Sequence, residues 1–362
     1  MTSQTLRSAQ QVGFVDDEVD LPVDEVLQGR QPAGELLQAL ALGHGGHLLV
    51  ETLPMGEILE SQLAPRCRVQ GEPTSPRRGA QGRLEPMSHL PTLVPLPVVS
   101  LGPEALFRVY DLAHDGVVTS GSMQTGPWMS GPNGIPCTGS LGVLVDNAMG
   151  YALIAARPQG HWSVSAEISM ELCATIPIDG SLLRAEASLL QADAFGGLAS
   201  ARVLDEGGRV IALCSQRGRF IGHDQASMLA PAWDADTDPA LTSSILGTAS
   251  LIGAEPLRTT DGGELNLTVT PRLLNPLGNL HGGISLYASE LVGLAALQRS
   301  GPQLETSSVH VVYARPIPLG CDVTFYASIT HRGQSLAVAQ VTSTNDAGKP
   351  CTIATVTAHS SP

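Results

Sequence analysis

The chain has 362 residues, a formal net charge of −14 and a hydrophobic content of 43%. This length allows two or three domains, each with its own core. The acidic balance argues against nucleic acid as a main partner, because phosphate binding needs a basic face. No run reaches about 18 consecutive apolar residues, so the sequence predicts no membrane span. The six widely spaced cysteines favour reduced thiols, no metal site and a cytoplasmic location.

Residues 1–95 are predicted to be a separate, partly disordered N-terminal region, because they combine an acidic start with a Pro/Gly/Arg-rich stretch. Within it, His44 and His47 flank two glycines. These histidines favour a loop over a metal site, since no Cys, Asp or Glu lies at ligand spacing.

From about residue 96 the pattern becomes regular. One or two strands are predicted before a glycine-rich turn and an apolar helix, and four strands with alternating apolar residues follow, up to residue 222. Gly207 and Gly208 predict a hairpin between the last two strands. A linker is predicted over 223–240, and the same order of elements returns over 241–362.

The two glycine-rich turns and helices are related by an offset of 144 residues, which superimposes NPLGNLHGGISLYASELVGLAAL at 275–297 on GPNGIPCTGSLGVLVDNAMGYAL at 131–153. This offset sets Glu290 on Asp146 and His281 on Cys137. The chain is therefore predicted to be a duplication whose copies have diverged at chemically active positions. A helix that is apolar nearly all round must be wrapped by its own sheet, which indicates an α+β fold class.

An Asn-x-x-Gly-x-x-His-Gly-Gly turn before such a helix resembles the hot-dog fold and, within it, the PaaI-type acyl-CoA thioesterases. The turn begins at Asn275, and YARPIPLG at 313–320 matches a later strand and turn of that family. The resemblance implies two hot-dog domains, 96–222 and 241–362, each an antiparallel sheet wrapped around a long central helix. Together they would form an internal pseudo-dimer, and that unit could pair again into a homo-dimer.

The resemblance also implies hydrolysis of an acyl-CoA at a composite site between the domains. Asp146 would act as general base or nucleophile. The Gly282 N–H, at the positive end of a helix dipole, would hold the oxyanion, and the Asn275 amide would be a second donor. His281 would brace the turn or bond a substrate amide, or it would only cap the helix. Ser165 lies about where the family places a hydroxyl that orients water, with an uncertainty of one residue.

The reciprocal site would pair Gly131, Cys137 and Thr138 with Glu290, and it lacks both the Asn amide and the His. We expect it to be weak or silent, although Glu290 remains a candidate for catalysis beside the alternative that it only faces solvent. For Cys137, packing at the helix start is favoured over a role as nucleophile.

The sequence predicts no cofactor, and CoA would enter only as part of the substrate. No P-loop or Rossmann fingerprint is present. The candidates to contact CoA are Gly283, Arg315, Arg332 and Lys349, for each of which an ordinary structural or surface role is the alternative. Two other functions stay open: an acyl-CoA-binding or scaffold protein with decayed catalytic residues, and, less favoured, an enoyl-CoA hydratase.

Overall fold

The computed structural model describes residues 94–95, 102–131, 134–222, 251–298 and 303–360. All of them belong to one unit, Arg83–Pro362. The predicted N-terminal region, apart from its last two residues, and the predicted linker therefore lie outside the described residues, as do His44 and His47.

The first half of the described chain follows the predicted order of elements. Two strands, β2 and β3, lie between residue 96 and the glycine-rich turn, and the two-residue β1 comes before them. A hairpin joins the last two strands at Gly208, whose φ of 79° suits glycine. A four-residue helix, α1, was not predicted. The elements are β1 (Val94–Pro95), α1 (Pro103–Leu106), β2 (Val109–His114), β3 (Val118–Gln124), α2 (Gly142–Ala155), β4 (His161–Leu172), β5 (Leu182–Ala192), β6 (Gly196–Asp205) and β7 (Val210–Gly222).

The second half repeats this plan of strands, helix and four further strands. Its elements are β8 (Leu257–Arg258), β9 (Gly262–Thr268), α5 (Gly282–Leu297), β10 (Leu304–Tyr313), β11 (Asp322–Arg332), β12 (Leu336–Asn345) and β13 (Pro350–Ser360). The alternation of apolar residues in these strands thus corresponds to real strands with one buried face.

All strands of the described residues form one antiparallel sheet of 13 strands, in the order β1-β2-β3-β5-β6-β7-β4-β10-β13-β12-β11-β9-β8. The two halves meet where β4 pairs with β10, with Ser169 opposite His310. At this junction the Ser169 Oγ lies 2.7 Å from the His310 Nδ1. Outward from the junction, equivalent strands of the two halves follow one another in the same order, and β1 at the edge has no counterpart.

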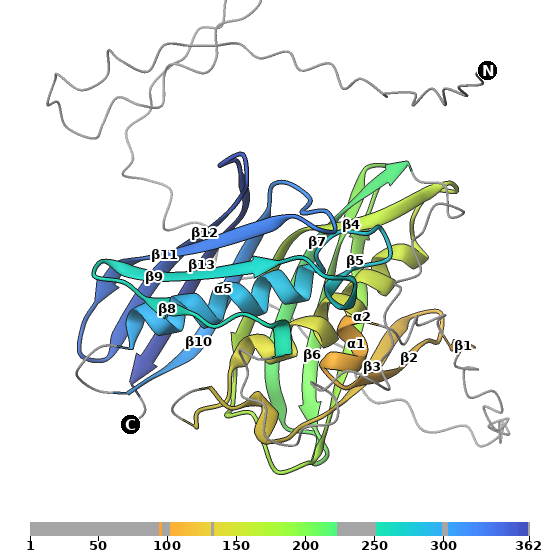
Figure 1. Cartoon of the computed structure of the whole chain (residues 1–362). Helices are drawn as coiled ribbons and strands as arrows, with labels where there is room; N and C mark the ends of the chain where they lie inside the picture. Colours follow the sequence, from red (N-terminus) through yellow and green to blue (C-terminus); the bar gives the residue numbers. More distant parts are fainter. Residues whose placement is uncertain (1–93, 96–101, 132–133, 223–250, 299–302, 361–362) are drawn as a thin grey trace, which may run out of the picture. The chain divides into compact units, whose positions relative to one another are not determined.

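The two helices are the centres of the two halves (Figure 1). Helix α2 contacts strands β2 to β7, and α5 contacts β8 to β13. Fully buried side chains such as Leu144 and Leu153 hold α2 against its strands, and each contributes roughly 1.5–3 kcal/mol. The first turns of the helices touch each other, since a Cβ on Gly283 would lie 2.5 Å from the carbonyl of Gly142. This contact brings the N-terminus of α5 to the first two turns of α2.

Candidate active site

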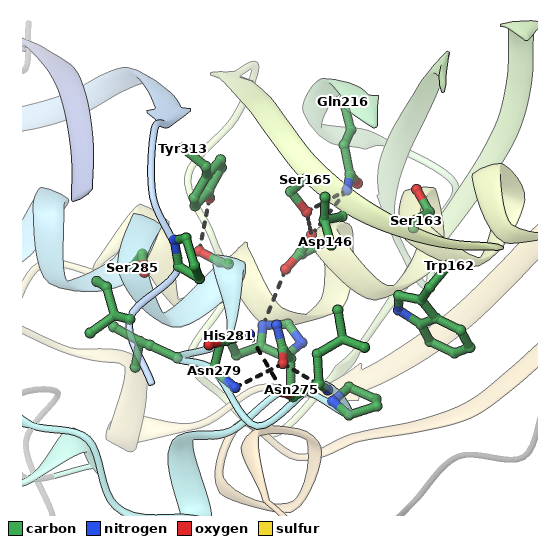
Figure 2. Close-up of a pocket in the computed structure, with 18 of the residues that line it drawn as sticks. Asp146, Trp162, Ser163, Ser165, Gln216, Asn275, Asn279, His281, Ser285 and Tyr313 are labelled. Carbon is green, nitrogen blue, oxygen red and sulfur yellow. Dashed lines mark hydrogen bonds and ion pairs between the residues drawn. The ribbon is translucent and has the colours of Figure 1, made fainter. Parts of the chain in front are cut away.

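Asp146 lies in the second turn of α2 and is 7% exposed. Its Oδ1 accepts hydrogen bonds from the Ser165 Oγ at 2.8 Å and the Gln216 Nε2 at 3.1 Å. Its Oδ2 accepts one from the backbone N–H of Gly283 at 2.9 Å. One carboxylate therefore joins α2, β4 and β7 of the first half to α5 of the second (Figure 2).

His281 is the N-cap residue of α5 and is 3% exposed. Its Nδ1 lies 3.0 Å from the Gly283 N and 3.2 Å from the Asp146 Oδ2. The Gly283 N–H donates to the His281 Nδ1 as well as to the Asp146 Oδ2, so the imidazole caps the start of α5 beside the carboxylate. His281 therefore braces the turn that faces Asp146.

Ser165 and Gln216 form a small hydrogen-bonded group with Asp146. The Gln216 Nε2 also donates to the Ser165 Oγ at 2.8 Å. The pairing of β4 with β7 shifts register between Ser165 and Glu167, and such a bulge re-aims a side chain. Gln216, 2% exposed, was missed in the sequence because a single glutamine in an alternating strand carries no signal of its own.

The turn before α5 is held by the side chain of Asn275. Its Oδ1 accepts from the backbone N–H groups of Leu277 at 3.0 Å and Asn279 at 3.1 Å. Gly278, with a φ of 76°, permits the left-handed backbone of this turn. The amide oxygen of Asn275 is thus used by its own loop, and only its Nδ2 group is left for a ligand. The predicted donor is present together with a structural role that was not predicted.

Gly282 begins α5, and N–H groups in the first turn of a helix have no partner within the helix. A Cβ at this position would lie 2.7 Å from the Asp146 Oδ2, so the close approach of the carboxylate requires glycine. The Gly282 carbonyl accepts a hydrogen bond from the Tyr313 hydroxyl at 2.8 Å. Burial, with a further contribution from the charge of Asp146, raises the pKa of Tyr313 well above its ordinary value, so it remains a neutral donor. Tyr313 was not singled out in the sequence.

A pocket of about 400 Å³ opens beside this group and is lined by both halves of the chain. From the first half come residues of α2, β4 and β7, and from the second half come the turn before α5 and the end of β10 (Figure 2). The lining includes Asp146, Asn147, Gly150, Tyr151, Ile154, Trp162, Ser163, Ser165, Gln216, Asn275, Asn279, His281, Gly282, Tyr313 and Arg315.

Among the residues proposed to contact CoA, only Arg315 lines the pocket. It is exposed, and its Nη1 donates to the Pro350 carbonyl at 2.7 Å. Lys349, the neighbour of Pro350, is exposed but does not line the pocket. Arg332 pairs with Ala337 near the start of β12, whereas Lys349 and Pro350 follow the end of that strand at Asn345. Because β12 has 10 residues, its two ends are roughly 30 Å apart. The structure therefore does not bring Arg332 to the pocket.

The prediction that Gly283 contacts CoA is also not supported by its placement. Gly283 is buried, its N–H donates to Asp146, and its α-carbon packs against Gly142. Glycine is required here by the contact between the helices, rather than by a ligand.

The reciprocal carboxylate, Glu290, is fully buried on α5. It accepts hydrogen bonds from the Cys137 Sγ at 2.7 Å, the Thr138 N at 3.0 Å and the Gly139 N. Burial, followed by the charge of Glu290, raises the pKa of the Cys137 thiol well above its ordinary value, so the thiol stays a donor. Glu290 does not line the large pocket, and its carboxylate is occupied by the protein itself. The alternative that Glu290 faces solvent is wrong, because the residue is fully buried, and a catalytic role for Glu290 stays a prediction.

In a comparison with known protein families, residues 277–352 match the thioesterase superfamily. A solved TesB protein from Mycobacterium avium subspecies paratuberculosis is similar over 72% of this chain and 98% of its own, with 13% identity and a TM-score of 0.51. The 12:0-ACP thioesterase from Umbellularia californica covers 68% of this chain and 95% of its own, with 12% identity and a TM-score of 0.47. The E. coli PaaI protein from the phenylacetic acid degradation operon covers 32% and 83%, with 22% identity and a TM-score of 0.30. A search of curated proteins returns no match.

The fold is similar to that of hot-dog thioesterases, and the match of residues 277–352 to the thioesterase superfamily supports a thioester hydrolase. The predicted resemblance to hot-dog thioesterases is thereby confirmed. Within the described residues, no helix is long and apolar enough to cross a membrane.

Proposed function

We propose that the protein is an acyl-CoA thioesterase with one working site, formed between two hot-dog domains that act as an internal pseudo-dimer. The observation that carries the proposal is the contact of Asp146, from the first half, with the turn at the start of α5. There the Asp146 Oδ2 lies 2.9 Å from the Gly283 N and 3.2 Å from the His281 Nδ1. Neither half could assemble this group alone.

In the proposed reaction, a water molecule beside Asp146 attacks the thioester carbonyl carbon while the carboxylate takes its proton. Ser165 and Gln216 hold the carboxylate through its Oδ1 and orient the water. The carbonyl oxygen becomes an oxyanion that is stabilised by the Gly282 N–H and the Asn275 Nδ2. The carbon–sulfur bond then breaks, and the thiolate recovers the proton from Asp146, which leaves a free acid and a thiol.

The thiol carrier is proposed to be CoA because a cationic side chain stands at the rim of the pocket. Arg315 is exposed there, and a guanidinium suits phosphate recognition. Lys349, next to the residue that Arg315 contacts, is the second cation proposed for the phosphates. Replacement of Arg315 with Gln should raise KM for an acyl-CoA and leave KM for an acyl-N-acetylcysteamine thioester, which has no phosphates, unchanged. Equal changes in KM for both substrates would show that Arg315 does not recognise the phosphates of CoA.

The decisive experiment compares Asp146→Asn with Glu290→Gln, the same conversion at the equivalent helix position. Release of free thiol from a panel of acyl-CoAs is measured, with circular dichroism as the check on folding. Asp146→Asn should lower kcat by a factor of about 10² to 10⁴, the usual contribution of a general base. Glu290→Gln, if folded, should keep most of the turnover. Equal losses in two folded variants would instead indicate two working sites.

The alternative function is a non-catalytic acyl-CoA-binding or scaffold protein, which the replacement of His and Asn by Cys137 and Gly131 in the first copy favours. Acyl-CoA affinity without thiol release by the intact chain would support it. A homo-dimer of the internal pseudo-dimer and a cytoplasmic location of the protein are also part of the proposal. The described cysteines are all free thiols, which fits a reducing compartment.

A further inference from the structure

A second, smaller pocket of about 140 Å³ lies beside the reciprocal carboxylate. The proposed reaction makes no use of it. Its described lining consists mostly of apolar residues from the first glycine-rich turn and from the second half of α5. These residues are Gly131, Ile135, Cys137, Pro256, Leu291, Leu294, Ala295 and Gln298.

This pocket is the internal counterpart of the large one. The offset of 144 residues that relates the two turns and helices carries every lining residue except Pro256 onto a residue that lines the large pocket. The pairs are Gly131 with Asn275, Ile135 with Asn279, Cys137 with His281, Leu291 with Asn147, Leu294 with Gly150, Ala295 with Tyr151, and Gln298 with Ile154. Duplication has therefore kept the cavity while its lining has changed.

Most changes on the two walls run from polar to apolar, and one at the end of the helix runs the other way, since Gln298 replaces Ile154. On the helix wall, Leu291 stands where the large pocket has Asn147. On the turn wall, Ile135 replaces Asn279 and Cys137 replaces His281, so the amide and the imidazole are gone.

The Cys137 thiol and the Gln298 side-chain NH₂ group of the small pocket are used by the protein. The Cys137 Sγ donates to Glu290 at 2.7 Å, and the Gln298 Nε2 donates to the Leu304 carbonyl at 2.8 Å. The described lining carries no Lys, Arg or His side chain. Arg258, which is exposed, contacts the lining only through the Gln298 backbone carbonyl, to which its Nη1 donates at 2.7 Å. Apolar cavities near 150 Å³ stay dry and accept a group of about the size of benzene.

We propose that the small pocket is a binding site for a short, neutral alkyl chain, which it holds without hydrolysing. The ligand class follows from the lining: apolar walls select a hydrocarbon chain, the lack of a cation rejects a free carboxylate, and the volume limits the chain to a few carbons. The small pocket has kept its cavity but has Gly131 and Cys137 where the large pocket has Asn275 and His281. It can therefore hold a ligand and lacks the donors that the proposed hydrolysis uses.

The test uses methyl-labelled intact protein and two probes, 1-hexanol and hexanoate. Addition of 1-hexanol should shift the methyl resonances of Leu291 and Leu294, and hexanoate should bind there more than about tenfold more weakly because its charge would be buried unpaired. The blocking variant is Ala295→Tyr, since the equivalent position of the first copy already carries Tyr151. In it the shifts at Leu291 and Leu294 should disappear, and the Ile154 methyl of the large pocket reports that the fold is intact.

Three results would overturn the proposal. One is the absence of shifts at Leu291 and Leu294 at concentrations of 1-hexanol that saturate any response at Ile154. Another is an equal affinity for hexanoate, which would require a cation at the site. The third is an unchanged response in folded Ala295→Tyr. If that variant does not fold, Ile135→Asn is used in its place, because the equivalent position of the other turn already carries an asparagine, Asn279. The new amide adds a polar group to the small pocket and should weaken binding of 1-hexanol.

Discussion

The carboxylates of Asp146 and Glu290 occupy equivalent helix positions but have different partners. Asp146 is held on one oxygen by Ser165 and Gln216 from the sheet, and on the other by the start of α5. Glu290 is one methylene longer, and its partners are the Cys137 thiol and the backbone of the opposing turn. This difference leaves Asp146 at the edge of a pocket and buries Glu290.

The strands explain why the partners differ. At the sheet junction, Ser169 of β4 lies opposite His310 of β10. Ser215 pairs with Ser169, and Thr355 pairs with His310. Ser215 and Thr355 therefore occupy equivalent positions. Their neighbours Gln216 and Val356 are therefore equivalent too, and valine has no amide to offer. On β10, Thr306 begins the bulge that corresponds to the one at Ser165, and its Oγ1 is buried without a hydrogen-bond partner.

A prediction at this scale concerns Ser165. A hydrogen bond to a charged group contributes about 1.5–3 kcal/mol, so Ser165→Ala should lower kcat by a factor of about 10 to 100. Ser169→Ala is the matched control on the same strand, since its hydroxyl bonds His310 at the sheet junction rather than the carboxylate. Steady-state thiol release measures both. A kcat for Ser165→Ala within twofold of the control would remove Ser165 from the mechanism.

A second prediction concerns Glu104 of α1, which accepts a hydrogen bond from the Asn147 Nδ2 at 3.0 Å. Burial raises its pKa above the ordinary value of 4.5, although nearby His281 acts in the opposite direction. The folded state therefore favours protonated Glu104. The stability that this protonated carboxyl contributes is fully present below pH 4.5 and is lost as the pH rises through the pKa of Glu104 in the folded protein. Glu104→Gln has no group that titrates here, so its stability does not show this pH-dependent loss. The free energy of unfolding of the variant, relative to the parent, should rise between pH 4.5 and neutrality.

Urea denaturation over a pH series measures this difference. A constant difference across the range would show that Glu104 has the same pKa in the folded and unfolded chain.

At the scale of elements, the start of α5 is defined by the close approach of Asp146 to Gly282. Alanine normally stabilises a helix by about 1 kcal/mol relative to glycine, but a Cβ on Gly282 would lie 2.7 Å from the Asp146 Oδ2. Gly282→Ala should therefore destabilise the protein and reduce turnover. The control is Gly150→Ala in α2, where the nearest contact of the new Cβ is at 3.9 Å and the protein should gain up to about 1 kcal/mol. Chemical denaturation of both variants distinguishes the two signs, and a stabilised Gly282→Ala would contradict the proposed contact.

The elements themselves were largely predictable, because apolar periodicity and glycine turns are local signals. The two long helices, the strands around them and the hairpin at Gly208 follow the predicted order. Helix α1 escaped prediction because four residues are too few to show a period. The position of Gln216 beside Asp146 depends on the pairing of β4 with β7 and on its bulge, and pairing is not written in either strand alone.

At the scale of the whole described unit, the sheet order explains the internal repeat in the sequence. Equivalent strands stand at equal positions from the β4–β10 junction, so the two turns face the two opposite helices. The loss of His and Asn from the first turn was visible in the sequence. The loss of Gln at Val356 was not, because the offset of 144 residues holds for the helices and changes along the strands: Gly208 and Gly348 are equivalent turn residues only 140 apart.

This reasoning predicts that the reciprocal site cannot be restored from its turn and carboxylate alone. In an Asp146→Asn background, the combination Gly131→Asn, Cys137→His and Glu290→Asp rebuilds the residues of the proposed active turn and its carboxylate. We expect no thiol release above that of Asp146→Asn alone, because Val356 offers no amide and Leu294 still fills space that Gly150 leaves open in the large pocket.

The same three substitutions with Asp146 intact provide the control, since turnover there shows that the chain still folds around the proposed active site. If that control is inactive, Glu290→Asp alone in the Asp146→Asn background tests the same point with a smaller change. Recovered turnover in the Asp146→Asn background would mean that the turn and carboxylate suffice for catalysis. If the rebuilt site stays inactive and recovers turnover when Val356→Gln is added, the glutamine on the strand is essential for catalysis. That residue corresponds to Gln216, whose role the sequence repeat does not reveal.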